Sequence, residues 1–221
     1  MPEIKGRIKK ITSHRLFLPL LCLALVLLFN IATTPDFFKI SIKNGMLYGY
    51  TIDIINRASE LVILSIGMTL VVAASGGTDI SVGAVMSVAA AICCFILSGG
   101  EHSVSQYQNP FALGIILALL ASVLCGCFNG LLVAKLKIQP MVATLILFTA
   151  GRGIAQLVTE GQITYIRVPG YKILGSAIPG IPLPLPVFAA VLAALITALV
   201  LKKTALGIYI QSVGINSKAS R

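Results

Sequence analysis

Long apolar runs alternate with short polar segments along the whole chain. Six apolar windows approach the roughly 20 residues that a membrane-spanning helix needs. They are Phe17–Ala32, Leu61–Ser75, Ile80–Leu97, Phe111–Ala134, Met141–Val158 and Pro186–Leu201. This pattern predicts an all-α fold, a polytopic transmembrane helical bundle with about six spans.

The composition supports the same fold class. Hydrophobic residues make up 57% of the chain and charged residues 11%, whereas ordinary soluble domains carry about 25% charged residues. The formal net charge is +10, but Lys and Arg stand in short clusters at predicted helix ends and follow no single polar face. The charge therefore indicates membrane topology, and we expect no nucleic-acid partner.

The positions of Lys and Arg predict an orientation in the membrane. Short loops rich in these residues stay on the cytoplasmic side. The N-terminal residues 1–16, the turn with Lys135 and Lys137, and the stretch after Leu201 all carry clusters, whereas 98–110 has no Lys or Arg. A cytoplasmic N-terminus with six spans puts every cluster inside, and five spans would not. The 33–59 loop, predicted to be external, departs mildly from this rule because it also contains basic residues.

One polar break stands out between two apolar windows. The segment Ser75–Gly83, SGGTDISVG, carries a carboxylate at Asp79, and a charge at bilayer depth costs roughly 2.5–3.5 kcal/mol. Broken helices at that depth survive where protein or a water-filled cavity satisfies the backbone. Asp79 could line a translocation path, or it could cap the following helix through backbone N–H groups with help from Ser81.

The later windows add two further polar candidates. Arg152, flanked by glycines, lies about 16 Å from Met141 at ~1.5 Å per residue, near the midplane of a core about 30 Å thick. We hypothesise that it pairs with Asp79 or lines a polar path. Gly126 and Gly130 form a G-x-x-x-G that predicts close helix packing, although Asn129 between them could face a path.

These features define a set of candidate residues, chosen because they are polar at membrane depth or are glycines of the break. The path candidates are Thr78, Asp79, Ser81, Asn129 and Arg152, and the motif glycines are Gly76, Gly77 and Gly83. The five cysteines have neither zinc-site spacing nor histidine partners, so we expect buried apolar side chains and no metal site.

Four motifs resemble the sugar permeases of bacterial ABC importers, in the group that handles ribose, xylose and galactose. The motifs are Asn56–Ala90, Asn129–Leu157, Lys202–Gly207 and Val213–Arg221. Within that group, the DFFKISIKNGMLYGYTIDIINRAS and GRGIAQLVTEGQI stretches look most like the galactofuranose importer permease. The resemblance covers the chain from about Phe17 onward.

The resemblance implies a monosaccharide permease of the bacterial cytoplasmic membrane, embedded in lipid, with no catalytic centre and no cofactor. Its partners would be a cytoplasmic ATP-binding subunit, an extracytoplasmic sugar-binding protein and a second permease subunit, identical or not. Residues 1–16 would be a basic cytoplasmic tail, 17–201 the permease domain and 202–221 an incomplete coupling segment. Within that segment, Gly214 and Asn216 match the family's G-x-N and would begin the contact with the ATPase.

Two expectations qualify this resemblance. Members of the group resemble one another over a chain roughly half as long again, so this sequence is expected to be an N-terminal part. An ion-coupled secondary transporter using Asp79 is the alternative function, because a carboxylate beside unwound backbone also builds an ion site. An intramembrane hydrolase is disfavoured because both histidines, His14 and His102, lie outside the apolar windows.

Overall fold

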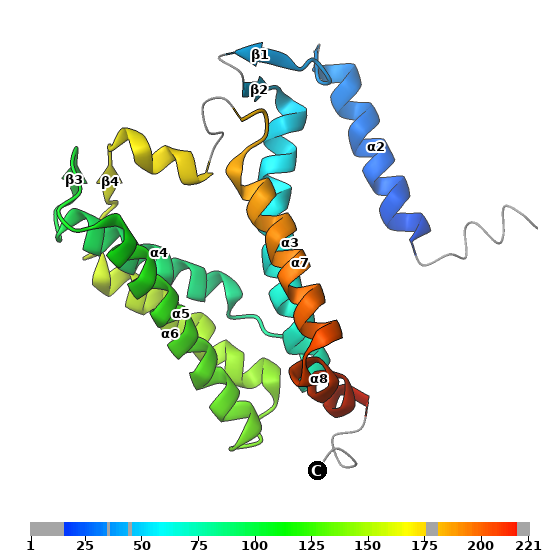
Figure 1. Cartoon of the computed structure of the whole chain (residues 1–221), viewed down its shortest axis with the longest axis vertical. Helices are drawn as coiled ribbons and strands as arrows, with labels where there is room; N and C mark the ends of the chain where they lie inside the picture. Colours follow the sequence, from blue (N-terminus) through cyan, green and yellow to red (C-terminus); the bar gives the residue numbers. More distant parts are fainter. Residues whose placement is uncertain (1–15, 35, 44–45, 176–180, 216–221) are drawn as a thin grey trace, which may run out of the picture.

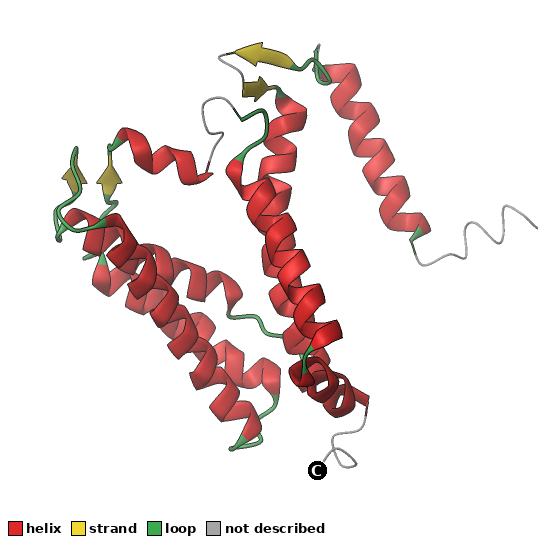
Figure 2. Ribbon diagram, viewed as in Figure 1, coloured by secondary structure: helices red, strands yellow, loops and turns green. Residues whose placement is uncertain are grey.

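A computed structural model describes residues 16–34, 36–43, 46–175 and 181–215 of the chain. Across these ranges the fold is almost entirely helical (Figures 1 and 2). The helices are α2 (Phe17–Thr33), α3 (Tyr50–Ser75), α4 (Val82–Ser98), α5 (Phe111–Ala134), α6 (Pro140–Val158), α7 (Leu185–Lys203) and α8 (Ala205–Ile215), with a 3-10 helix, η1 (Pro169–Gly175). The predicted all-α class is confirmed.

Each predicted apolar window coincides with one helix. The bounds of α5 match the prediction, whereas α3 begins at Tyr50 and extends well beyond the window predicted from Leu61. Among the described residues, α3, α5, α6 and α7 are long and apolar enough to cross a membrane. The apolar helices α2 and α4 have 17 residues each, the lower end of the range for a spanning helix.

The helices form two groups on either side of a gap (Figure 1). In the first, α4 packs against α5 and α6, and in the second, α3 packs against α7 and α8. We call these the α4–α6 bundle and the α3–α7–α8 bundle. Helix α2 stands apart and has no buried residue within the described chain, which suits a helix surrounded by lipid.

Small side chains let α4 and α6 approach closely. A Cβ at Gly151 of α6 would lie 3.1 Å from Cβ of Ala84, which is fully buried on α4. Ala143 and Leu147 of α6 and Val88 of α4 are also buried. Because lipid is as apolar as leucine, helices in membranes associate through such close packing between small residues.

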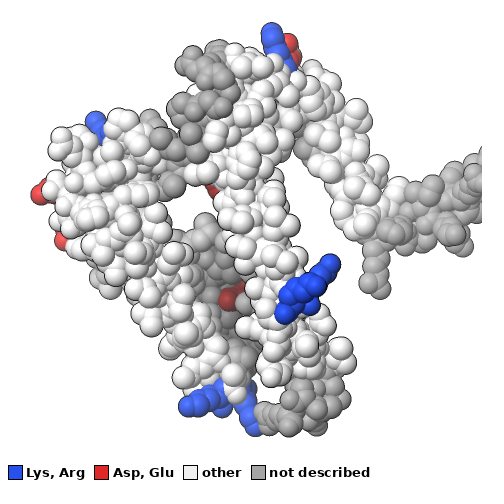
Figure 3. All heavy atoms as spheres, in the orientation of Figure 1, with Lys and Arg blue, Asp and Glu red and all other residues white. Residues whose placement is uncertain are grey.

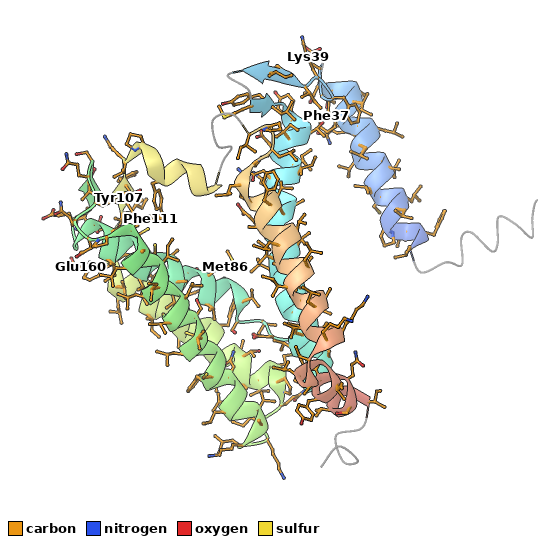
Figure 4. All side chains as sticks on the ribbon, in the orientation of Figure 1. Phe37, Lys39, Met86, Tyr107, Phe111 and Glu160 are labelled. Atoms are coloured by element: carbon orange, nitrogen blue, oxygen red, sulfur yellow. The ribbon has the colours of Figure 1, made fainter. Side chains whose placement is uncertain are left out.

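Three predicted external loops meet at one end of the molecule. Strands β1 (Ser41–Lys43) and β2 (Met46–Tyr48) form an antiparallel pair, and β3 (Ser103–Val104) pairs in parallel with β4 (Tyr165–Ile166). The side chains labelled at this end include Phe37 and Tyr107 (Figure 4). The turn between α5 and α6 lies at the opposite end (Figure 1), so the predicted alternation of loops between two ends is confirmed.

The 3-10 helix η1 packs against α7, and single contacts tie it to α4 and to α3. The hydroxyl of Tyr171 lies 3.8 Å from Sγ of Cys94, and Nδ2 of Asn56 on α3 donates to the carbonyl of Gly175 at 3.0 Å. Burial raises the pKa of Tyr171, and the neighbouring Cys94 adds to the shift, so the phenol stays neutral.

Candidate functional site

Two glycines shape the break between α3 and α4. Gly76 ends α3 with a positive φ of 66°, and its N–H donates to the carbonyl of Val72 at 2.9 Å. A Cβ at Gly77 would lie 2.5 Å from Cβ of Pro140, the first residue of α6. The left-handed turn and the close approach each favour glycine. The third motif glycine, Gly83, has open space around it.

Asp79 organises the turn that begins α4. Its Oδ1 accepts hydrogen bonds from the N–H of Ser81 at 2.7 Å and from the hydroxyl of Ser81 at 2.6 Å. Ser81 is the N-cap residue of α4 and is fully buried. Asp79 therefore stabilises the start of α4 through Oδ1. Its other oxygen, Oδ2, makes no hydrogen bond to any described residue.

Side chains of α5 and α6 hold this turn from two sides. Nδ2 of Asn129 donates to the hydroxyl oxygen of Ser81 at 2.9 Å, and the N–H of Ile80 donates to Oγ1 of Thr144 at 3.2 Å. Asn129 is 7% exposed, and its Oδ1 is buried without a partner in the described chain. The sequence prediction missed Thr144, whose only signal is a hydroxyl near the start of an apolar helix.

A cavity of about 650 Å³ opens beside the break, between the two bundles. Its size falls within the roughly 300–1,000 Å³ of typical small-molecule sites. The polar lining residues are Ser75, Thr78, Asp79, Asn129, Lys137 and Thr144; the others are Val71, Ala74, Gly126, Gly130, Val133, Ala134, Pro140 and Val213. The space-filling view shows the opening between the bundles, with acidic atoms inside it (Figure 3).

The cavity brings together part of the predicted path. Thr78, Asp79 and Asn129 line it, and the buried Ser81 lies directly behind them, hydrogen-bonded to both Asp79 and Asn129. The packing predicted for the G-x-x-x-G is wrong within the described chain. A Cβ at Gly126 or Gly130 would meet no atom within 4 Å, because both glycines border the cavity.

Comparison with known proteins decides the family. Residues 50–221 match the family described as branched-chain amino acid transport system / permease component. The chain belongs to this permease family. The motif resemblance and the membrane-spanning fold agree with this result, and the permease is a multi-pass protein of the inner membrane.

Several relatives of this permease are named as permease proteins for sugars. It is 46% identical to the galactofuranose transporter permease protein of Escherichia coli, over 91% of this chain and 56% of the relative. It is 35% identical to the fructose import permease protein of Bifidobacterium longum, over 97% of this chain and 59% of the relative. For the ribose import permease protein of Haemophilus influenzae, the values are 32%, 90% and 58%.

The permease thus spans less than two thirds of the length of these relatives. The predicted resemblance to the sugar permease group, with the galactofuranose importer among its members, is confirmed. No solved structure matches the chain.

Arg152 of the permease lies away from the cavity. It is exposed on α6, with its guanidinium carbon 4.4 Å from the centre of the Phe148 ring. The ion pair formed among the described residues joins Lys39 to Asp36, so the hypothesised pair between Arg152 and Asp79 is absent there. Its role in a path stays a prediction.

The predicted coupling segment begins with a helix that packs inward. A Cβ at Gly214 of α8 would collide with the backbone carbonyl of Ala73 on α3, so this glycine allows the two helices to touch. The neighbouring Val213 lines the cavity. Asn216 lies outside the described residues, and the coupling role of both G-x-N positions stays a prediction.

Proposed function

We propose that the chain is the membrane-spanning permease part of an ABC importer that moves a monosaccharide, such as a pentose or hexose, into the bacterial cytoplasm. The observation that carries this proposal is the cavity at the α3–α4 break, where Asp79 and Asn129 place polar atoms between two helical bundles. Relatives named as permeases for galactofuranose, fructose and ribose support the substrate class.

Energy and substrate would come from partner proteins. The sequence has no G-x-x-x-x-G-K-S/T phosphate loop, so a separate cytoplasmic subunit would bind ATP. That subunit would dock at the end that carries Lys135, Lys137 and the two lysines in the last turn of α7, which the positive-inside rule assigns to the cytoplasm. An extracytoplasmic sugar-binding protein would face the end with the β-strands, and a second permease subunit would complete the path.

One face of α3 links the cavity to that outer end. Asp53, Arg57 and Glu60 are exposed and follow the i, i+4, i+7 spacing of a single helix face. Val71, which lines the cavity, comes 18 residues after Asp53, which is five turns at 3.6 residues per turn. Because charges avoid lipid, this face would border water, and it supports a polar route along α3.

Uptake in the source cells tests the proposal. Removing the gene for this chain should abolish ATP-dependent uptake of radiolabelled galactose, fructose or ribose, and restoring it should recover uptake. Two treatments separate an ABC importer from the ion-coupled alternative that uses Asp79. ATP depletion should stop uptake by an ABC importer, whereas an ionophore should stop an ion-coupled transporter while ATP remains. Unchanged uptake of all three sugars after gene removal would contradict the proposal, and lost leucine uptake would point to the amino acid instead.

The path assignment predicts which substitutions impair transport. Asp79→Asn should lower uptake several-fold, because it changes the free oxygen in the cavity from an acceptor to a donor. Arg152→Leu should also lower uptake if the path continues along α6. Membrane insertion, measured by quantitative blotting of membranes, should stay normal in both variants. Wild-type uptake in both would refute the path assignment.

The orientation predicts a labelling pattern. On a background without the five native cysteines, a cysteine at His102 should react with a membrane-impermeant maleimide added outside, because His102 is exposed. A cysteine at Lys137 should not react. A cysteine at Tyr171 should react more slowly than one at His102, since that position is half-buried. Strong external labelling at Lys137 would overturn the orientation.

A further inference from the structure

We call the part of the cavity formed by Thr78, Asp79 and Asn129 the polar corner. It contains hydrogen-bond acceptors that no group in the described chain uses. Oδ2 of Asp79 has no partner there, and Oδ1 of Asn129 is buried without one. A buried acceptor left unpaired costs about 1–3 kcal/mol. Nδ2 of the same planar amide is held by Ser81, so Oδ1 of Asn129 stays within the wall of the cavity.

Most hydrogen-bond donors in and beside the polar corner already donate to other groups of the protein. Nδ2 of Asn129 donates to Ser81, the hydroxyl of Thr144 donates to the carbonyl of Met141, and the hydroxyl of Ser75 donates to the carbonyl of Val71. Thr78 alone keeps a hydroxyl with no hydrogen bond to the described residues. The lining thus offers one unused acceptor, Oδ2 of Asp79, and one hydroxyl, that of Thr78, which can donate or accept.

Most of the remaining cavity wall is apolar and would contact the C–H groups of a ligand. Val71, Ala74, Val133, Pro140 and Val213 are apolar. Among the described lining residues Lys137 is the basic one; it is exposed and belongs to the turn between α5 and α6. A ligand that fits must bring donors on one side and C–H groups on the other. Neutral polyhydroxylated molecules have this chemistry, whereas anionic ligands would face the Asp79 carboxylate.

We propose that Thr78 and Asp79, with Asn129 holding the turn behind them, form a subsite for neutral polyols, in which Oδ2 of Asp79 and the Thr78 hydroxyl bind adjacent hydroxyl groups of the ligand. The proposal rests on the proposed function for its choice of sugars, and it adds where in the membrane domain the sugar is recognised and by which atoms. It also gives the subsite a selectivity, since a phosphorylated sugar would bring its negative charge toward the Asp79 carboxylate.

Protection from labelling tests the subsite on the chain itself. The 221-residue chain, without its native cysteines and with Val133→Cys as a reporter in the cavity wall, is placed in lipid nanodiscs. The rate of maleimide labelling is measured with D-ribose, D-fructose or sorbitol, and with ribose 5-phosphate or L-leucine. The three neutral polyols should slow labelling several-fold, and the other two compounds should not.

Substitutions assign the protection to the corner. Asn129→Leu and Asp79→Asn should abolish it, and Thr78→Val should weaken it without affecting folding, because this hydroxyl bonds to no described residue. Asn56→Leu is the matched control, since its Oδ1 is also buried and unpartnered but the residue does not line the cavity. Protection by leucine instead, or full polyol protection in all three corner variants, would overturn the subsite.

The two proposals fail in different experiments. Sugar uptake that depends on this chain, combined with no polyol protection, would overturn the subsite and leave the importer proposal standing. Polyol protection that the corner variants abolish, combined with uptake that does not depend on the chain, would support the subsite and overturn the importer proposal. Size-exclusion chromatography confirms that each variant is folded before its labelling is compared.

Discussion

Replacing Gly77 with valine will destabilise the chain. A Cβ at this position would lie 2.5 Å from Cβ and 2.6 Å from Cγ of Pro140, a rigid ring at the start of α6. Overpacking of this kind costs about 1–3 kcal/mol. We expect the melting temperature in detergent to fall by about 2–12 °C, measured by fluorescence-detected size exclusion.

Gly83→Ala is the matched control from the same motif. Its Cβ would meet no atom within 4 Å, and alanine favours helix over glycine, so stability should be kept or raised slightly. Equal destabilisation by the two substitutions would show that the contact between Gly77 and Pro140 is not what holds the break in place.

Gly151→Leu will separate α4 from α6. A Cβ at Gly151 would already lie 3.1 Å from Cβ of Ala84 and 3.5 Å from its carbonyl oxygen, so a leucine side chain cannot fit without moving a helix. The expected loss is about 2–3 kcal/mol, again measured as thermal stability in detergent. Because α4 carries Ser81 at its N-terminus, the network around Asp79 should be disturbed as well.

Gly153→Leu tests whether the effect is specific to this contact. Gly153 lies two residues further along α6, on the other side of Arg152, and has open space where a Cβ would stand. We expect little change in stability for Gly153→Leu. A loss of stability as large as that of Gly151→Leu would mean that added bulk anywhere on α6 is destabilising. The contact between Gly151 and Ala84 would then not explain the effect of Gly151→Leu.

Much of the fold could be predicted from hydrophobic windows alone, because a spanning helix must be apolar over most of its length. The bounds of α5 were predicted correctly. The start of α3 was not, since Asp53, Arg57 and Glu60 interrupt the apolar pattern without interrupting the helix. A helix can continue through charged residues because its backbone hydrogen bonds do not depend on them, provided that the charged side chains reach water.

The site was predictable in part for a similar reason. A carboxylate between two apolar windows is conspicuous, and Asp79 does lie in a cavity. Pairwise contacts were not predictable. The G-x-x-x-G of Gly126 and Gly130 indicates an accessible backbone, but sequence does not say whether a helix or an empty space faces it. The partner of Arg152 could not be chosen by charge alone, since helix rotation decides which side chains meet.

The pairing of α3 with α7 has a consequence for biosynthesis. The helices of the α4–α6 bundle follow one another in the chain, so each can pack soon after it is made. About 110 residues separate the end of α3 at Ser75 from the start of α7 at Leu185. At about 5–20 residues per second, a ribosome needs roughly 5–20 s to synthesise that stretch. During this time α3 is in the membrane before α7 has been synthesised. The face of α3 that carries charged residues must then be kept from lipid by the insertion machinery or by the α4–α6 bundle.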